Sequence, residues 1–184
     1  MKRLVLAAVT ITTMLGAAPL LAQPAPTRVA HADSVIHADR AIAERIAGKV
    51  RNYTNYTIFD DINIGVDHGI VTLSGRVTME YKAKDLARIA ARVQGVTEVN
   101  NEIETLPVSI YDDRLRSTLA RQIYRDPVFD RYAIHVNPPI HIIVERGRVT
   151  LAGFVNSPLE RQKAEFIARS TFGVFDVENR LQID

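Results

Sequence analysis

Apolar and polar residues alternate along two stretches of this chain, and a short turn sequence containing glycine divides each stretch in two. The first stretch is INIGVDHGIVTLSGRV (62–77) and the second is IHIIVERGRVTLAGFV (140–155). Alternation with a period of two is typical of strands that bury one face, and the glycine in DHG or ERG favours a tight turn. Each stretch therefore predicts a β-hairpin.

The two hairpins belong to a longer internal repeat. Gly69 is matched by Gly147, 78 positions later (147 − 69), and residues beyond the hairpins keep the same offset. Those residues are Ile89, Ala90, Gly95, Val96, Val99 and Asn101 in the first copy, and Ile167, Ala168, Gly173, Val174, Val177 and Asn179 in the second. A register that holds across strand, helix and strand indicates a duplicated structural unit.

Apolar residues at three- and four-residue spacing predict a helix after each hairpin. In the second copy, the sequence Ser157-Pro158-Leu159-Glu160 is a capping box with proline at the first helical position. One more helix is expected before each hairpin, beginning near Asp39 and near Asp112. Gly75 and Gly153 are assigned to the fold, where they allow a bulge or the close approach of a helix.

The predicted fold class is α+β, with two repeated α-β-β-α-β units. Each unit is a small mixed three-stranded sheet with two helices on one face. The first domain is expected over residues 39–106 and the second over 109–184, joined by the short link LPVS. Residues 1–22 are interpreted as a signal peptide and residues 23–38 as a flexible leader.

The N-terminal segment has the charged, apolar and small-residue order of a secretory signal. Lys2 and Arg3 precede an apolar run that closes with Ala22, so we expect cleavage near Ala22 and a soluble periplasmic product. A membrane anchor is the alternative, but the run is short and poorly apolar for a stable span. Gln23 stands where a lipoprotein carries cysteine, and the chain has no cysteine, which excludes lipid acylation and disulfides.

Net charge and residue types argue against several functions. Removal of Lys2 and Arg3 leaves 21 basic side chains (23 − 2) against 21 acidic ones, so no nucleic-acid partner is expected. The five histidines show no metal-ligand spacing; they are His31, His37, His68, His135 and His141. The pairs Asp60-Asp61 and Asp112-Asp113 are interpreted as helix-start residues rather than catalytic carboxylates. No nucleophile or phosphate-binding motif is present, so we expect no enzyme activity, cofactor, metal or small-molecule substrate.

The two copies differ most in the segment before the second hairpin. YRDPVFDRYAIHVNPP (124–139) is longer than its counterpart NYTNYTIFDD (52–61) and mixes arginines with aromatic residues, as suits a surface that contacts lipid headgroups or protein. The alternative is that the aromatic residues pack in the core and the arginines are solvated. The candidate lipid- or partner-binding residues are Arg114, Arg121, Arg125, Phe129, Arg131 and Tyr132.

The hairpin phrase with its two glycines, the amphipathic helix and the closing phrase GVxxVxN resemble the BON domain, twice in tandem. This resemblance implies a role in envelope integrity under envelope or osmotic stress, with binding of phospholipid surfaces and, in some members, chaperone-like support of secreted proteins. It implies no catalytic residue. The expected partner is therefore an anionic phospholipid surface or an envelope protein, and the sequence leaves both open.

Overall fold

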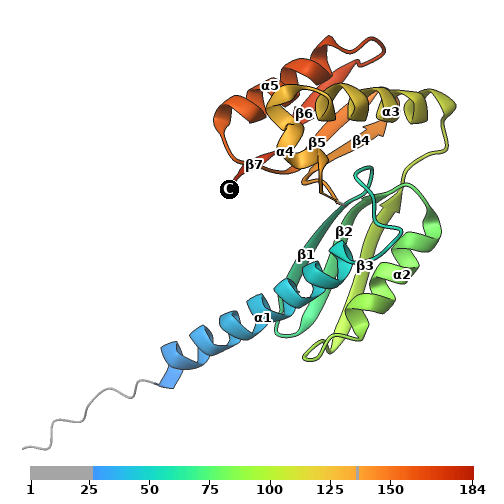
Figure 1. Ribbon diagram of the computed structural model, residues 1–184. Helices are drawn as coiled ribbons and strands as arrows, with labels where there is room; N and C mark the ends of the chain where they lie inside the picture. The colour runs from blue at the N-terminus through green and yellow to red at the C-terminus, as the bar shows by residue number, and fades with distance from the viewer. Residues whose placement is uncertain (1–26, 136) are drawn as a thin grey trace, which may run out of the picture.

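The protein folds into two domains of the same topology, one above the other in Figure 1. The structure is a computed structural model that describes residues 27–135 and 137–184. The predicted signal peptide, residues 1–22, lies outside the described residues. Within them, both predicted α-β-β-α-β units are present, which confirms the α+β fold class.

The first domain contains a three-stranded mixed sheet. Its elements are α1 (Thr27–Arg51), β1 (Asp61–Asp67), β2 (Ile70–Val77), α2 (Glu80–Ala91) and β3 (Glu98–Thr105). The strand order is β1-β2-β3, in which β1 runs antiparallel and β3 parallel to β2. After the predicted hairpin, α2 returns the chain so that the closing strand β3 lies beside β2 and parallel to it.

The second domain repeats this plan with two additions. Its elements are α3 (Ile110–Tyr124), η1 (Pro127–Phe129), α4 (Asp130–Ala133), β4 (Ile140–Glu145), β5 (Arg148–Val155), α5 (Pro158–Ser170), β6 (Asp176–Asn179) and β7 (Gln182–Ile183). The predicted closing strand is interrupted after Asn179, so β6 and β7 pair separately with β5 and the sheet has four strands instead of three. The short helices η1 and α4 fill the segment that is longer than its counterpart in the first domain.

The helix α1 begins earlier than the sequence predicted. We expected a flexible leader up to residue 38 and a helix from Asp39, but α1 is helical from Thr27. The segment from Thr27 to Ala47 contains several alanines and neither glycine nor proline, and alanine has the highest intrinsic helix propensity. Pro26 stands just before the start, where proline is compatible with a helix that begins after it.

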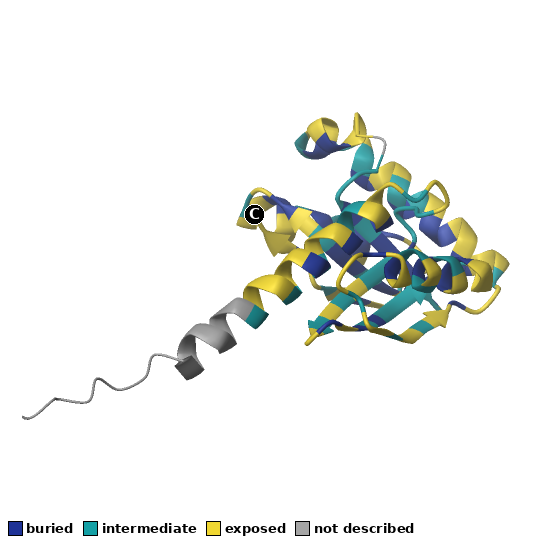
Figure 2. Ribbon diagram, turned by 90° about the horizontal axis from the view of Figure 1, so that it is seen from below, coloured by how far each residue is buried: buried dark blue, intermediate teal, exposed yellow. Residues whose placement is uncertain are grey.

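Both helices of each domain cover one face of its sheet, and the core lies between them. In the first core, Ile46 of α1 and Leu86 of α2 pack with Leu73 of β2. The second core contains Leu119 and Leu151, among other residues. Figure 2 shows buried residues concentrated along the strands and the inner sides of the helices. The other face of each sheet carries mostly polar side chains.

Gly75 and Gly153 are required by the close approach of a neighbouring backbone. Their φ angles are 123° and 101°, in the region that favours glycine. A Cβ atom at Gly75 would overlap the carbonyl oxygen of Asp61, and one at Gly153 would overlap that of Pro139. The neighbour is therefore the segment at the start of the first strand, and the expected close approach of a helix was wrong.

The two domains are joined by direct contacts as well as by the link. The backbone N–H of Ile142, on the edge strand β4, donates to the carbonyl of Ile58 in the first domain at 2.7 Å. Arg76 of β2 forms an ion pair with Glu145 of β4 at 2.5 Å. The loop between α1 and β1 thus lies along the edge of the second sheet.

His141 lies in this contact between the domains. Its Nδ1 is 2.6 Å from the carbonyl oxygen of Asp60, and its ring is 5.3 Å from that of Tyr56. Burial lowers the pKa of His141 from 6.5, and this effect outweighs the opposing effects of the Asp60 carbonyl and of the carboxylates of Asp60 and Asp61. The neutral ring, with its proton on Nδ1, therefore fits the interface best.

We predict that acid weakens the contact between the domains. Because the folded pKa of His141 is lowered, its contribution to stability is present above pH 6.5 and is lost as the pH falls from 6.5 through the folded pKa. Urea unfolding at about pH 7.5 and pH 5.5 measures this loss as a lower midpoint at the acid pH.

The variant His141→Gln keeps a donor for the Asp60 carbonyl but cannot titrate, so its midpoint is expected to change less with pH than that of the parent. His37→Gln, at an exposed position on α1, is the control. A parent and an H141Q variant with the same pH dependence would contradict the prediction.

Candidate functional site

Three of the predicted arginines lie on or at the end of α3 with exposed side chains. Arg114 and Arg121 belong to the helix, and Arg125 is its C-terminal cap. The Arg121 guanidinium donates to the hydroxyl of Thr118 at 3.4 Å. Among the side chains of residues 35–135 and 137–184, none of the three arginines forms an ion pair with a carboxylate. They are therefore placed as the surface hypothesis requires.

Phe129 and Tyr132 do not lie on the surface, which corrects their assignment as contact residues. Phe129 is fully buried and Tyr132 is 6% exposed. Both belong to the core of the second domain, where their ring centroids are 6.2 Å apart. The turns of η1 and α4 direct these rings inward, because burial of large aromatic side chains contributes strongly to stability. For these two residues the core alternative is the one observed.

Arg131 is exposed, but its charge is already balanced within the domain. It forms an ion pair with the buried carboxylate of Glu160, and its guanidinium carbon lies 5.2 Å from the centre of the Tyr132 ring. Glu160 Oε2 also accepts from the Tyr132 hydroxyl at 2.6 Å and from the backbone N–H of Asn156 at 2.8 Å. The expected capping box is thus half formed: Ser157 Oγ accepts from the Glu160 N–H, while the Glu160 carboxylate binds neighbouring groups instead.

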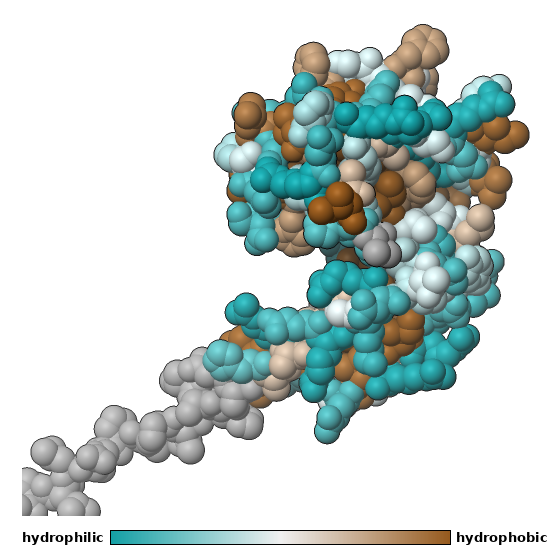
Figure 3. Space-filling model, in the orientation of Figure 1, coloured by the Kyte–Doolittle hydropathy of each residue, from teal (hydrophilic) through white to brown (hydrophobic). Residues whose placement is uncertain are grey.

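The structure brings a different set of residues together on the second domain. Tyr111, Phe172 and Phe175 are 81%, 100% and 83% exposed, and they surround a hollow of about 540 Å³ that Arg114 and Arg146 also line. We call these five residues the aromatic–basic patch. In Figure 3, apolar side chains appear at several places on the second domain, whereas the visible face of the first domain is mainly hydrophilic. Three large exposed rings in one place are uncommon without a partner.

The hairpin turn between β4 and β5 fixes the position of the patch. Asp112 of α3 accepts hydrogen bonds from the backbone N–H groups of Arg146 and Gly147, at 2.9 and 3.0 Å. The Phe175 N–H donates to the Gly147 carbonyl at 2.9 Å. A Cβ atom at Gly147 would overlap the Phe175 ring, so only glycine allows the ring to lie there. The backbone at Arg146 and Phe175 is thus held in place beside α3.

Sequence reasoning missed the aromatic members of the patch, although the repeat contained a signal for two of them. Phe172 and Phe175 occupy the positions that Gln94 and Thr97 occupy in the first domain. Replacement of polar residues by phenylalanine beside a turn glycine does not follow from packing, because both rings are exposed. A comparison of the two copies position by position would have identified this loop.

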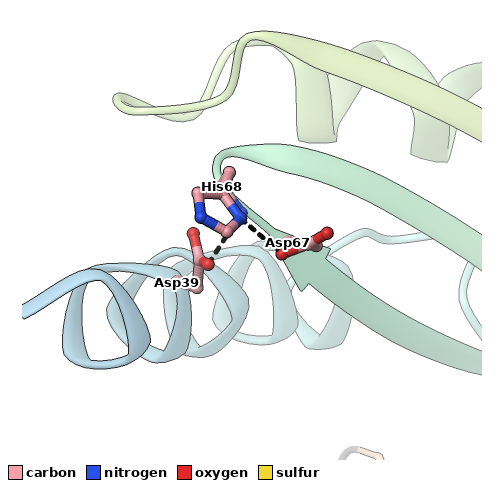
Figure 4. A group of neighbouring side chains, drawn as sticks. All are labelled: Asp39, Asp67 and His68. Atoms are coloured by element: carbon pink, nitrogen blue, oxygen red, sulfur yellow. Dashed lines mark hydrogen bonds and ion pairs between the residues drawn. The ribbon is translucent and has the colours of Figure 1, made fainter. Parts of the chain in front are cut away.

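Asp39, Asp67 and His68 form the other group with possible chemistry (Figure 4). Asp39 uses both carboxylate oxygens to accept from the backbone N–H groups of His68 and Gly69, at 2.8 and 3.0 Å. His68 Nδ1 lies 2.6 Å from Asp67, and this hydrogen bond raises the pKa of the imidazole. Arg146, which cannot bind a cation, takes the place of His68 in the second domain. The arrangement is therefore explained by the hairpin turn it supports.

The sequence was also compared with known families and proteins. A family model described as BON domain matches residues 38–107 and again residues 111–184. The chain belongs to the BON domain family. Within residues 27–135 and 137–184, we find no helix that is long and apolar enough to cross a membrane.

One curated relative is the osmotically-inducible protein Y of Escherichia coli (strain K12). The two sequences are 29% identical over 153 residues, which cover 78% of this chain and 72% of the relative. Two solved structures of CdsD, a structural protein of the type III secretion system of Chlamydia trachomatis, are also similar. One is 15% identical, covers 79% of this chain and 67% of its own, and has a TM-score of 0.32. The other is 11% identical, covers 78% and 93%, and has a TM-score of 0.29.

We predict that alanine substitution of two phenylalanines in the second BON domain changes stability to very different extents. Phe129→Ala removes a fully buried ring and is expected to lower the free energy of unfolding by about 3–5 kcal/mol. Phe172→Ala removes an exposed ring and is expected to change it by no more than about 0.5 kcal/mol. Urea unfolding of both variants beside the parent measures this difference. Similar losses in both variants would show that the loop at Phe172 is packed rather than exposed.

Proposed function

We propose that this protein is a non-enzymatic periplasmic protein of the osmotic-stress response that binds anionic phospholipid surfaces through its second BON domain. The observation that supports this most directly is the aromatic–basic patch, in which exposed rings stand beside arginines that have no ion-pair partner among the described residues. The signal-like N-terminal sequence supports a periplasmic location. The name of the relative, osmotically-inducible protein Y, supports the link to osmotic stress.

The chemistry of the patch suits the boundary between lipid headgroups and acyl chains. The ring of Tyr111 suits this boundary because it places an apolar body against lipid and a hydroxyl group against water. The rings of Phe172 and Phe175 are wholly apolar and can insert among the acyl chains. Arg114 and Arg146 can pair with phosphate groups, and each basic residue near an anionic surface contributes about 1 kcal/mol. Attraction of this size gives reversible binding that salt weakens, because exposed charges are screened within about 8 Å at physiological ionic strength.

The proposed contact lies closer to the start of α3 than the sequence suggested. Phe129 and Tyr132 are excluded by burial, and Arg131 is paired with Glu160. Arg114 joins the patch directly, and Arg121 lies further along α3 with its side chain exposed. Arg125 follows at the end of the same helix. These arginines extend the positive charge from the patch along one side of α3.

We predict that substitution of the patch abolishes most vesicle binding without unfolding the domain. The parent is expected to sediment with vesicles of phosphatidylglycerol and phosphatidylcholine in equal parts, less so at physiological salt, and not with pure phosphatidylcholine. Two double variants test the patch: Arg114→Ala/Arg146→Ala and Phe172→Gln/Phe175→Thr. Each should reduce vesicle binding about tenfold or more, since each removes two anchoring groups. The phenylalanine variant introduces the residue types that the first domain has at the equivalent positions, Gln94 and Thr97.

The charge-matched control is Arg51→Ala/Arg92→Ala, which removes two exposed arginines from the first domain. It should bind like the parent. Equal losses in the patch variants and in this control would mean that binding reflects total charge alone. A parent that binds no vesicle but suppresses aggregation of an unfolded client would reject the lipid proposal in favour of a chaperone-like module.

A further inference from the structure

The second domain closes the edges of its sheet with side chains from the covering helices. On the edge strand β6, Arg169 donates to the carbonyl of Val177 and Arg161 to that of Asn179, both at 3.2 Å. An unpaired strand edge is a template for another strand, so these hydrogen bonds protect the domain from edge-to-edge pairing.

The opposite edge, strand β4, is closed in the same way. Arg116 of α3 donates to the Val144 carbonyl at 2.6 Å, and the Tyr124 hydroxyl donates to that of Ile140 at 2.5 Å. The contact with Ile58 of the first domain occupies the N–H between them. Both outer edges of the second sheet are thus hydrogen-bonded.

The first domain has alanine where the second has these arginines. At the repeat offset of 78, Ala91 corresponds to Arg169 and Ala83 to Arg161. The strand registers match, since Val71 pairs with Val99 as Val149 pairs with Val177. The carbonyls of Val99 and Asn101 therefore point away from β2, toward the free edge of the sheet, like their counterparts in the second domain. No side chain between residues 35 and 184, Val136 aside, donates a hydrogen bond to them.

One feature of the β3 edge is shared with the second domain. Asn101 donates to the Ala83 carbonyl at 3.2 Å, as Asn179 does to that of Arg161 at 2.9 Å, which holds the edge strand against its helix. The Asn101 side chain also accepts from the Ile103 N–H, at the long distance of 3.4 Å. The edge of β3 is thus firmly positioned while its carbonyls remain open.

The side chains of β3 define what kind of strand could pair with it. The side chains on the open face of the sheet are polar and exposed: Glu98, Asn100, Glu102 and Glu104. On the helix side, Val99 and Ile103 are half-buried. Residues on an added strand would continue this alternation. Basic residues would lie beside the glutamates, and apolar residues beside Val99 and Ile103.

The groove beside β3 favours positive charge as well. The open faces of the two sheets enclose a groove of about 1070 Å³, lined by six carboxylates and four guanidinium groups. Glu102 and Glu104 lie on one wall, and Asp176 and Glu178 on the other. Some of these charges pair with one another, because Arg76 pairs with Glu104 and Glu145 and Arg180 pairs with Glu178. The carboxylates of Asp61, Glu102 and Asp176 remain beside the guanidinium groups of Arg146 and Arg148, so the lining stays negative on balance.

We propose that the β3 edge of the first domain binds, by strand addition, an extended polypeptide segment in which basic residues alternate with apolar ones. A second copy of this chain is a poor occupant, because its own β3 would place glutamates opposite glutamates. The β3 edge is on the other domain from the lipid contact proposed above and does not depend on it, although Arg146 and Phe175 of the aromatic–basic patch also line the groove. Main-chain hydrogen bonds supply affinity in this mode of recognition, and alternate side chains supply specificity.

The test uses the full chain and a fluorescent peptide of alternating lysine and valine, as long as the eight residues of β3. Fluorescence anisotropy should show binding of this peptide and none of the corresponding glutamate–valine peptide. The variant Glu98→Lys/Glu102→Lys should bind the lysine peptide about tenfold more weakly and now bind the glutamate peptide, because both cross-strand charge pairs are reversed. Both substituted positions are exposed, so the fold is retained.

Two further measurements separate strand pairing from simple charge attraction. The lysine peptide methylated on alternate backbone nitrogens cannot pair with β3 and should lose binding. Ala91→Arg, which supplies the group that Arg169 supplies in the second domain, should also weaken binding, and Gln94→Arg, with the same added charge on the following loop, should weaken it less. Equal binding of the methylated peptide, or no reversal of preference by the glutamate variant, would overturn the proposal.

Discussion

The hairpin of each domain depends on one carboxylate that reaches it from the preceding helix. Asp39 and Asp112 each accept two backbone N–H groups of a turn whose residues have positive φ. Charged acceptors make strong hydrogen bonds, and here they satisfy donors that the turn directs away from the ladder. The chain separation between this aspartate and the turn glycine is 30 residues in the first domain and 35 in the second. The five additional residues (35 − 30) are absorbed by η1 and α4 without any change at the turn.

A second pair of contacts shows how the two copies keep a geometry while changing its chemistry. Lys82 of α2 is buried and pairs with Asp60 at 2.7 Å, and at the same repeat position Glu160 of α5 pairs with Arg131. The charge on the helix is reversed, yet in both domains an ion pair ties the start of that helix to the segment before the first strand. Both partners are buried in the first domain, whereas only the carboxylate of Glu160 is buried in the second. Removal of one partner from the fully buried pair of Lys82 and Asp60 costs about 3–5 kcal/mol, because the remaining charge stays buried. Asp60 therefore has a structural role before β1, and its interpretation as a helix-start residue was wrong.

The sequence was sufficient for the features that local patterns determine. Alternation around Gly69 and Gly147 predicted both hairpins, and the constant offset predicted that their helices and closing strands would match. It failed where the outcome depends on what a side chain meets in three dimensions. The order of aromatic and basic residues from 124 to 139 does not reveal that Phe129 turns inward. Likewise, the sequence around Phe175 does not reveal that its ring lies against Gly147. The domain boundaries at 39–106 and 109–184 remain predictions, close to the two family matches.

The unequal edges of the two sheets make the two domains respond differently to ionic strength. The second domain protects its edges with hydrogen bonds from arginine and tyrosine side chains to strand carbonyls, and salt affects such short contacts little. The first domain protects β3 mainly through the mutual repulsion of exposed glutamates. Repulsion between exposed charges decreases as the Debye length shortens, from about 8 Å at physiological ionic strength to about 3 Å at 1 M. A concentrated salt solution therefore weakens the protection of the first domain against edge-to-edge association and leaves that of the second domain intact.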